Sequence, residues 1–250
     1  MAERTSYPPG TFSWAELVTS DGDAAKAFYT QLFGWEYDDQ PISDDAVYSM
    51  AKIDGKSVAA LFADQTQPPH WNCYVTVASA DETAGKVGEL GGQLLAEPFD
   101  VMEVGRMAVF TDPAGAALCI WEARQHIGAE LVNMPGALTW NDLLTPDAAA
   151  SEQFYGDLFG WTFSEIPDAM GYRVITNGER SNGGIMQRSD SPPAWMPYFG
   201  HEDVDGLAGS LADLGARPLG DVVRMPQGSI LPVMDPQGAV FAVWTGEYQD

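Results

Sequence analysis

The sequence predicts an α+β fold of four βαβββ modules, two in each of two homologous domains. An eight-residue segment, FYTQLFGW at 28–35, recurs 126 residues later as FYGDLFGW at 154–161, with six of the eight positions identical. Each half also repeats one order of strand, helix and paired strands, and closes with Asp-Pro-x-Gly, at 112–115 and 235–238. Such a repeat indicates a duplicated domain. We therefore expect domains at 8–124 and 134–247, joined by a linker around 123–135.

The first module begins with a predicted strand at 12–19, where the residues alternate in character. Asp21 and its neighbours supply an N-cap for a helix at 23–33, in which Phe28 and Leu32 share a buried face. Gly34 is placed to end this helix in the left-handed conformation. Two strands, at 47–53 and 57–63, follow and are joined by Asp54-Gly55, a strong hairpin signal.

The second module repeats this order after Pro68-Pro69. We expect a helix at 81–90, a proline turn at 112–115, and strands at 71–77, 93–96, 106–111 and 116–122. The second half of the chain copies the first, since the segment PPAW at 192–195 matches PPHW at 68–71.

Composition limits the partners of the protein. The formal net charge of −24 disfavours nucleic acid, because such a surface repels phosphates. No apolar run approaches the ~20 residues that span a membrane, and the N-terminus has no apolar signal core. Two cysteines, Cys73 and Cys119, give no disulfide framework. We expect a cytoplasmic globular protein whose partner is a small molecule.

The helix motif Phe-Tyr-x-x-Leu-Phe-Gly-Trp and the Asp-Pro-x-Gly turn, each present twice in order, resemble the vicinal oxygen chelate superfamily. That superfamily includes glyoxalase I, the bleomycin-resistance proteins and the extradiol dioxygenases, and the chain is most similar to two-domain glyoxalase-like proteins of actinobacteria. The resemblance covers residues 10–244. It implies that paired modules form a half-open β-barrel, a cup that holds the ligand. In metal-using members, four strand positions supply His, Gln or Glu to one divalent ion.

The resemblance does not carry a set of metal ligands into this chain. The four positions fall on Trp14, Ala60, Asn72 and Cys119 in the first domain, and on Trp140, Ile185 or Met186, Met196 and Ala242 in the second. A metal site needs several converging N, O or S donors. The only histidines, His70, His126 and His201, share no motif. We therefore expect no metal and no other cofactor, as in the drug-binding resistance proteins of this superfamily.

Alternation along strands places a set of side chains inside the two cups. Aromatic walls with few polar groups suit a planar or hydrophobic organic molecule. An alternative is that the tryptophans only fill the barrel and that Cys119 is an inert buried thiol. Arg106 is a candidate contact for an anionic ligand. The predicted ligand-binding residues are Trp14, Asn72, Tyr74, Arg106, Cys119 and Trp121 in the first cup, and Trp140, Met196, Tyr198 and Trp244 in the second.

Glu16 and Asp142 occupy equivalent places on apolar strands, where a carboxylate costs free energy unless it is paired or solvated. Burial would raise the pKa and give each a role as general base. The structural alternative is a hydrogen bond to a tryptophan indole or to backbone across the domain interface.

Two functions are consistent with these residues. The first is a metal-free protein that binds an aromatic or hydrophobic metabolite or antibiotic. The second is an enzyme of the same superfamily, a lyase, isomerase or cyclase, or hydroxylase-like, that uses Glu16 or Asp142 as general base or a divalent metal in a non-standard site. The sequence fits a monomer or a homodimer.

Overall fold

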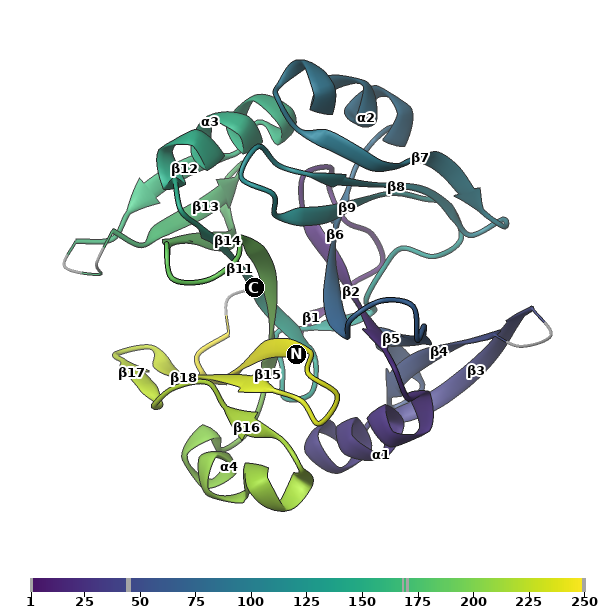
Figure 1. Cartoon of the computed structure of the whole chain (residues 1–250), viewed down its shortest axis with the longest axis vertical. Helices are drawn as coiled ribbons and strands as arrows, with labels where there is room; N and C mark the ends of the chain where they lie inside the picture. Colours follow the sequence, from purple (N-terminus) through teal and green to yellow (C-terminus); the bar gives the residue numbers. More distant parts are fainter. Residues whose placement is uncertain (1, 44–45, 168, 170, 249–250) are drawn as a thin grey trace.

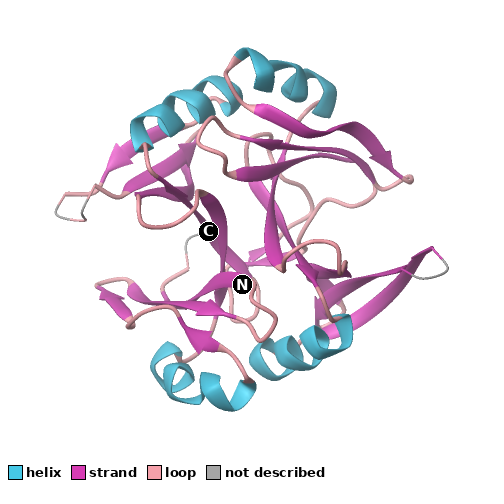
Figure 2. Ribbon diagram, in the orientation of Figure 1, coloured by secondary structure: helices cyan, strands magenta, loops and turns pink. Residues whose placement is uncertain are grey.

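The computed structural model describes residues 2–43, 46–167, 169 and 171–248. Its strands form two curved sheets, one from each half of the chain, with the helices on the outside (Figures 1 and 2). This confirms the predicted α+β fold of four βαβββ modules. No helix in the described ranges has the length and apolar character needed to cross a membrane.

The first sheet contains two modules and has the strand order β3-β4-β5-β2-β6-β9-β8-β7. The first module comprises β2 (Phe12–Thr19), α1 (Gly22–Phe33), β3 (Glu36–Ser43), β4 (Ala46–Ile53) and β5 (Lys56–Ala63). The second comprises β6 (His70–Thr76), α2 (Ala80–Glu89), β7 (Gln93–Val101), β8 (Gly105–Thr111) and β9 (Ala117–Ala123). Because β2 pairs with β6, the two modules share one continuous sheet.

The second sheet repeats this arrangement in the order β12-β13-β14-β11-β15-β19-β18-β16. The third module comprises β11 (Leu138–Thr145), α3 (Ala148–Phe159), β12 (Thr162–Glu165), β13 (Arg173–Asn177) and β14 (Arg180–Gln187). The fourth comprises β15 (Ala194–Gly200), α4 (Val204–Ser210), the 3₁₀ turn η1 (Leu211–Leu214), β16 (Arg217–Pro218), β17 (Val223–Met225), β18 (Gly228–Met234) and β19 (Val240–Gly246). Here β16 and β17 both pair with β18, so the first strand after the helix is split in two.

The local signals placed most elements within one or two residues. Asp21 caps α1 by accepting a hydrogen bond from Ala24 N–H, and Gly34 ends the helix with φ 72°. Strand β3 was not predicted, because it is polar and mostly exposed and therefore shows no apolar alternation. The predicted end of β7, at residue 96, was also too early.

Helices of different domains pack together at the two ends of the molecule. Figure 1 shows α1 beside α4 at one end and α2 beside α3 at the other. Each end has an apolar core made by both domains: modules one and four supply most of one core, and modules two and three supply most of the other. The sheets therefore hold modules together within a domain, and the helices hold the domains together.

The two repeated motifs contact each other across the domain interface. The Tyr29 hydroxyl of α1 donates to Asp235 of the opposite domain's Asp-Pro turn, at 2.9 Å, and Tyr155 of α3 donates to Asp112 at 3.2 Å. Asp112 in turn accepts the N–H groups of residues 114–116. The duplicated motifs are thus structural, and they bind the two halves reciprocally.

The segment between the domains is also structured. Short strands β1 (Ala2–Glu3) and β10 (Leu131–Val132) pair with each other, and β10 joins the second sheet beside β11. The Trp35 indole donates to the carbonyl of Gly136, and the Trp161 indole donates to the carbonyl of Gly10, both at 2.7 Å. The segment that leads into the first strand of each domain is therefore held by a tryptophan of the other domain.

Candidate ligand-binding cups

The concave face of the first sheet, here called cup 1, brings several predicted residues together. In the register of the central strands, Glu16 lies between Ala60 of β5 and Asn72 of β6. Trp14 pairs with Tyr74, and Tyr74 pairs with Cys119 of β9. The neighbouring residues Ala15, Leu17 and Cys73 point instead into the interdomain cores. Alternation along the strands therefore gives this face its aromatic character.

Glu16 is the polar centre of cup 1. The carboxylate is half-buried, and its Oε1 accepts hydrogen bonds from Asn72 Nδ2 at 3.3 Å and from the Tyr74 hydroxyl at 3.1 Å. Burial, followed by the negative charge of Glu16, raises the pKa of Tyr48 and of Tyr74 well above the usual value. Both phenols therefore stay protonated donors beside the carboxylate.

The linker closes one end of cup 1. The His126 imidazole packs edge-on against the Trp14 ring, with 4.6 Å between ring centroids, and the Trp121 indole donates to the His126 carbonyl at 2.8 Å. Ala129 is buried in the same cluster, and its carbonyl accepts the Tyr7 hydroxyl. His126 Nε2 is buried and finds no hydrogen-bond partner within the described chain, and burial lowers the pKa of His126 to about 4.

The second sheet has an equivalent concave face, cup 2, with a different polar centre. Asp142 lies between Gly184 and Met196 in the register and is only 2% exposed. Its Oδ1 accepts the Trp140 indole at 2.9 Å and the Tyr172 hydroxyl at 2.7 Å, and its Oδ2 accepts the Tyr198 hydroxyl at 2.5 Å. Burial raises the pKa of Asp142 despite these donors. The predicted structural alternative, a hydrogen bond to a tryptophan indole, is therefore present in cup 2.

Glycines make room for the aromatic side chains of both cups. A Cβ at Gly184 would lie 1.9 Å from the Tyr172 hydroxyl and 2.5 Å from Asp142 Oδ1, so only glycine fits there. The Trp121 ring covers Gly105, and the Trp244 ring covers Gly228 in the same way. Trp121 is buried in cup 1, where residues 126–129 pack against the aromatic cluster, whereas Trp244 and Trp140 of cup 2 are half-exposed.

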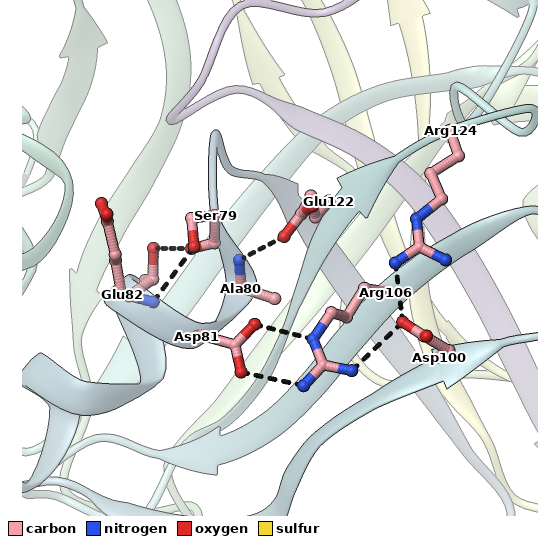
Figure 3. Close-up of polar contacts among 9 residues, drawn as sticks. Ser79, Ala80, Asp81, Glu82, Asp100, Arg106, Glu122 and Arg124 are labelled. Carbon is pink, nitrogen blue, oxygen red and sulfur yellow. Dashed lines mark hydrogen bonds and ion pairs between the residues drawn. The ribbon is translucent and has the colours of Figure 1, made fainter.

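Of two further predicted residues, Arg106 is not in the position expected and Cys119 is. Arg106 lies on the convex side of the first sheet, where its guanidinium binds Asp81 of α2 at 2.7 and 2.8 Å and Asp100 of β7 at 3.1 Å (Figure 3). Arg124 also donates to Asp100. Strand alternation turns Arg106 away from cup 1, so the structure contradicts its predicted contact with a ligand there. Cys119 does face cup 1, but it is 1% exposed and burial raises its pKa well above the usual value, as for an inert thiol.

The residues present do not fit the superfamily's metal ion. The strand register corrects two of the metal-ligand positions that the superfamily resemblance implied. Glu16, rather than Trp14, pairs with Ala60. In the second domain Gly184, rather than Ile185 or Met186, is the counterpart of Ala60. Alanine and glycine carry no ligand atom, and the Asp142 oxygens already accept three donors. Across the ranges described above, no group of three or more His, Cys, Asp or Glu side chains is placed to hold a metal.

Two surface hollows lie outside the cups. One, of about 390 Å³, lies between α1 and α4 and includes His201 and Asp213 in its wall. The other, of about 370 Å³, lies under the linker and includes Arg4, His126 and Glu130. Leucines and polar side chains line the first hollow and mainly polar side chains line the second, and among the residues described neither wall includes a tryptophan, tyrosine or phenylalanine.

Three residues that were not predicted, Tyr48, Tyr172 and His126, also lie in the cups. Tyr48 and Tyr172 occupy equivalent places in the two domains. Tyr48 lies two residues before the partner of Ala60, and Tyr172 lies two residues before the partner of Gly184. The repeat offset of 124 could therefore have identified both. His126 gave no such signal, because it lies in the linker and has no counterpart in the repeat. Its position depends on how the linker crosses the first domain.

Comparison with family models and curated proteins agrees with this geometry. A glyoxalase-like domain model matches residues 14–121, and a bleomycin resistance protein-like N-terminal model matches residues 138–178. The Mycobacterium tuberculosis protein named "Putative glyoxylase CFP32" is 41% identical over 254 residues, covering 97% of each chain. The "Anthracycline biosynthesis protein DnrV" of Streptomyces peucetius is 30% identical, covering 96% of this chain and 94% of its own.

Solved structures share the fold. The Mn(II)-bound glyoxalase from Novosphingobium aromaticivorans has a TM-score of 0.67 at 18% identity, covering 96% of this chain and 86% of that one. The 2,3-dioxygenase LapB from Pseudomonas sp. KL28 has a TM-score of 0.66 at 13% identity, covering 97% and 94%. The chain belongs to the glyoxalase-like family of the vicinal oxygen chelate superfamily. Its relatives are glyoxalase-like proteins of actinobacteria.

Proposed function

We propose that the protein binds a planar aromatic or hydrophobic small molecule, a metabolite or an antibiotic, in cup 1 without a resident metal ion. One observation carries this proposal: Trp14, Tyr48 and Tyr74 surround the half-buried Glu16, while its register neighbours Ala60 and Asn72 complete no set of metal ligands. Aromatic walls around a few polar groups are typical of sites for organic ligands.

The outer wall of cup 1 supports this proposal. Met50 pairs with Ala60, and Phe99 pairs with Met107, so all of these side chains share the concave face. Phe99 is 44% exposed, and both methionines are half-exposed. Apolar side chains left open on a concave face favour an apolar ligand. The name of one relative, an anthracycline biosynthesis protein, fits a polycyclic aromatic compound.

Isothermal titration calorimetry with acridine and with an anthracycline tests ligand binding. Met50→Ala is expected to weaken the affinity about fivefold, because it removes apolar contact area on the concave face. Val47→Ala is the matched control, since Val47 lies on the same strand, is 41% exposed, and points away from the cup. Equal affinities for both variants would place binding elsewhere, and no binding of either compound would contradict the proposal for polycyclic ligands.

Elemental analysis tests the metal-free part of the proposal. Protein purified without chelators is expected to contain Mn, Fe, Ni and Zn only in substoichiometric amounts, because the donor set around Glu16 is incomplete. One equivalent of any of these metals, lost in a Glu16→Gln variant, would contradict the proposal.

An enzymatic function with Glu16 as general base is the second candidate. The observation that favours it is that the Glu16 carboxylate is half-buried and open to a ligand, whereas the Asp142 carboxylate is buried and both its oxygens accept hydrogen bonds. For any substrate found, Glu16→Gln is expected to lower kcat by about 100-fold or more. Full turnover in that variant would remove the candidate.

Three further predictions stay part of this proposal. The cytoplasmic location rests on the two unpaired cysteines, both of which are buried. The domain limits remain 8–124 and 134–247. The state in solution, monomer or homodimer, is open, and light scattering coupled to size-exclusion chromatography decides it.

A further inference from the structure

Cup 1 contains a carboxylate without a cationic partner. The hydrogen bonds to Glu16 come from the Asn72 amide and from the phenols of Tyr74 and Tyr48, which are all neutral donors. No ion pair of Glu16 is recorded in the described part of the chain, whereas Asp81, Asp100, Asp38 and Asp39 all have one. A half-buried charge that lacks an opposite charge is costly unless solvent or a ligand compensates it.

No lysine or arginine of the first half, as far as the structure describes it, has a recorded contact with Glu16. Arg4 lies in the hollow beside the linker, where its charge acts on Tyr7 at the edge of cup 1, and Lys86 lies in the last turn of α2 on the outside of the molecule. His126 approaches Trp14, but its lowered pKa, about 4, leaves it neutral. The other cations are ion-paired: Lys26 with Asp39, Lys52 with Asp38, Lys56 with Glu3, Arg106 with Asp81 and Asp100, and Arg124 with Asp100.

Aromatic rings surround this carboxylate. Trp14 donates its indole N–H to the Tyr48 hydroxyl at 3.2 Å, and Tyr74 donates to Glu16. The negative charge of Glu16 is among the causes that raise the pKa of both tyrosines and of Cys119, so these groups stay neutral. A carboxylate beside the rings of tryptophan and tyrosine is a favourable environment for an organic cation, which gains both a charge-assisted hydrogen bond and cation–π attraction.

Cup 2 does not offer the same environment for an organic cation. Asp142 is buried, and three donors from Trp140, Tyr172 and Tyr198 occupy its oxygens. Met196 stands where cup 1 has the polar Asn72. A ligand in cup 2 would have to displace this network before it reached the carboxylate.

We propose that cup 1 selects an organic cation, a ligand with an aromatic or apolar body and a protonated amine that pairs with Glu16. This inference rests on the proposed binding function and names the class of ligand for the same site. The amine lies on the carboxylate between Asn72 and Tyr74, and the body of the ligand lies against Met50, Phe99 and Met107.

Three ring-matched probes test the charge preference: 9-aminoacridine, a cation at neutral pH; acridine, which is neutral; and acridine-9-carboxylate, an anion. The calorimetry is done in physiological salt, because the salt weakens non-specific attraction between a cation and the acidic surface of the protein. The cation is expected to bind about tenfold or more tightly than acridine, and the anion most weakly. Glu16→Gln is expected to remove the difference between the cation and acridine. Asp213→Asn, which removes an exposed charge at the α1–α4 hollow, is expected to leave both affinities unchanged.

A second variant keeps the test valid if Glu16→Gln perturbs folding. Asn72→Lys places an ammonium group beside Glu16, and it is expected to abolish the preference for 9-aminoacridine while acridine still binds. Equal affinities of the wild-type protein for the cation and acridine would overturn the charge preference and leave aromatic binding intact. Binding that weakens in Asp213→Asn rather than in Glu16→Gln would move the cation site to the α1–α4 hollow and overturn the inference. If none of the three rings binds, the proposed function itself fails for polycyclic ligands.

Discussion

The two equivalent carboxylates differ because of single residues around them. Asp142 is one methylene shorter than Glu16, and it lies beneath Tyr172, whose hydroxyl fits only because residue 184 is glycine. Ala60 takes the place of that glycine in cup 1. In cup 2 the result is a buried, fully hydrogen-bonded group, and in cup 1 it is a half-buried carboxylate with neutral donors. Duplicated positions thus differ in chemistry.

The Asp142→Asn variant tests the state of the buried carboxylate. An asparagine keeps one acceptor but turns an amide toward a hydroxyl or indole donor, so we expect a loss of about 1–3 kcal/mol in the free energy of unfolding. Because burial raises the pKa of folded Asp142 above its unfolded value, the stability this group contributes is present at low pH and is lost as the pH rises through the folded pKa.

The stability gap between wild type and Asp142→Asn should therefore narrow as the pH rises from below the ordinary carboxyl value of 3.8 towards neutrality. Urea titrations of both proteins at each pH measure this gap. Because all other titratable groups are the same in both proteins, their contributions cancel in the difference between the two free energies of unfolding. A gap that widens over this range would mean that the donors outweigh burial and that the folded pKa is lowered.

Helices α1 and α3 use the same tyrosine to reach the opposite domain. Tyr29 and Tyr155 are fully buried, and each donates to the aspartate of an Asp-Pro turn whose other oxygen accepts three backbone N–H groups. The shorter hydrogen bond, at 2.9 Å, is that of Tyr29. These two elements explain why the helix motif and the turn motif occur together.

Tyr29→Phe is expected to lower the free energy of unfolding by about 1.5–3 kcal/mol, because it leaves a buried aspartate oxygen without its donor. Chemical denaturation measures the loss. Gly85→Ala in α2 is an informative control: Gly85 is exposed in a helix and its Cβ would meet nothing within 4 Å, so alanine should stabilise by roughly 0.5–1 kcal/mol. If Tyr29→Phe left the free energy of unfolding unchanged, the hydrogen bond would contribute little to holding the domains together.

At the scale of the whole molecule, each apolar core belongs to both domains. Phe28 and Trp71 of the first domain share a core with Leu207 and Phe241 of the second. Since neither domain buries its convex face alone, we expect the chain to unfold in one cooperative transition.

Leu207→Ala tests this cooperativity. Leu207 is 5% exposed in α4, so we expect a cost of about 2–4 kcal/mol. Hydrogen exchange should show an equal loss of protection in β5 of the first domain and in β19 of the second. Val223→Ala, at a residue 51% exposed, should change neither. Protection retained in β5 would show that the first domain folds independently.

The sequence by itself determined the four modules, the helix caps, the strand faces and the family. These features follow from local chemistry and from a repeat. Asp21 starts a helix and Gly34 ends it, whatever the helix packs against. Alternation places Trp14 and Glu16 on one face of a strand. Only the tertiary structure decided the direction of Arg106, the position of His126 and the difference between the two cups. Those depend on strand register, on the path of the linker and on contacts between residues far apart in the sequence, such as Tyr198 with Asp142 and His126 with Trp14, none of which leaves a local pattern in the chain.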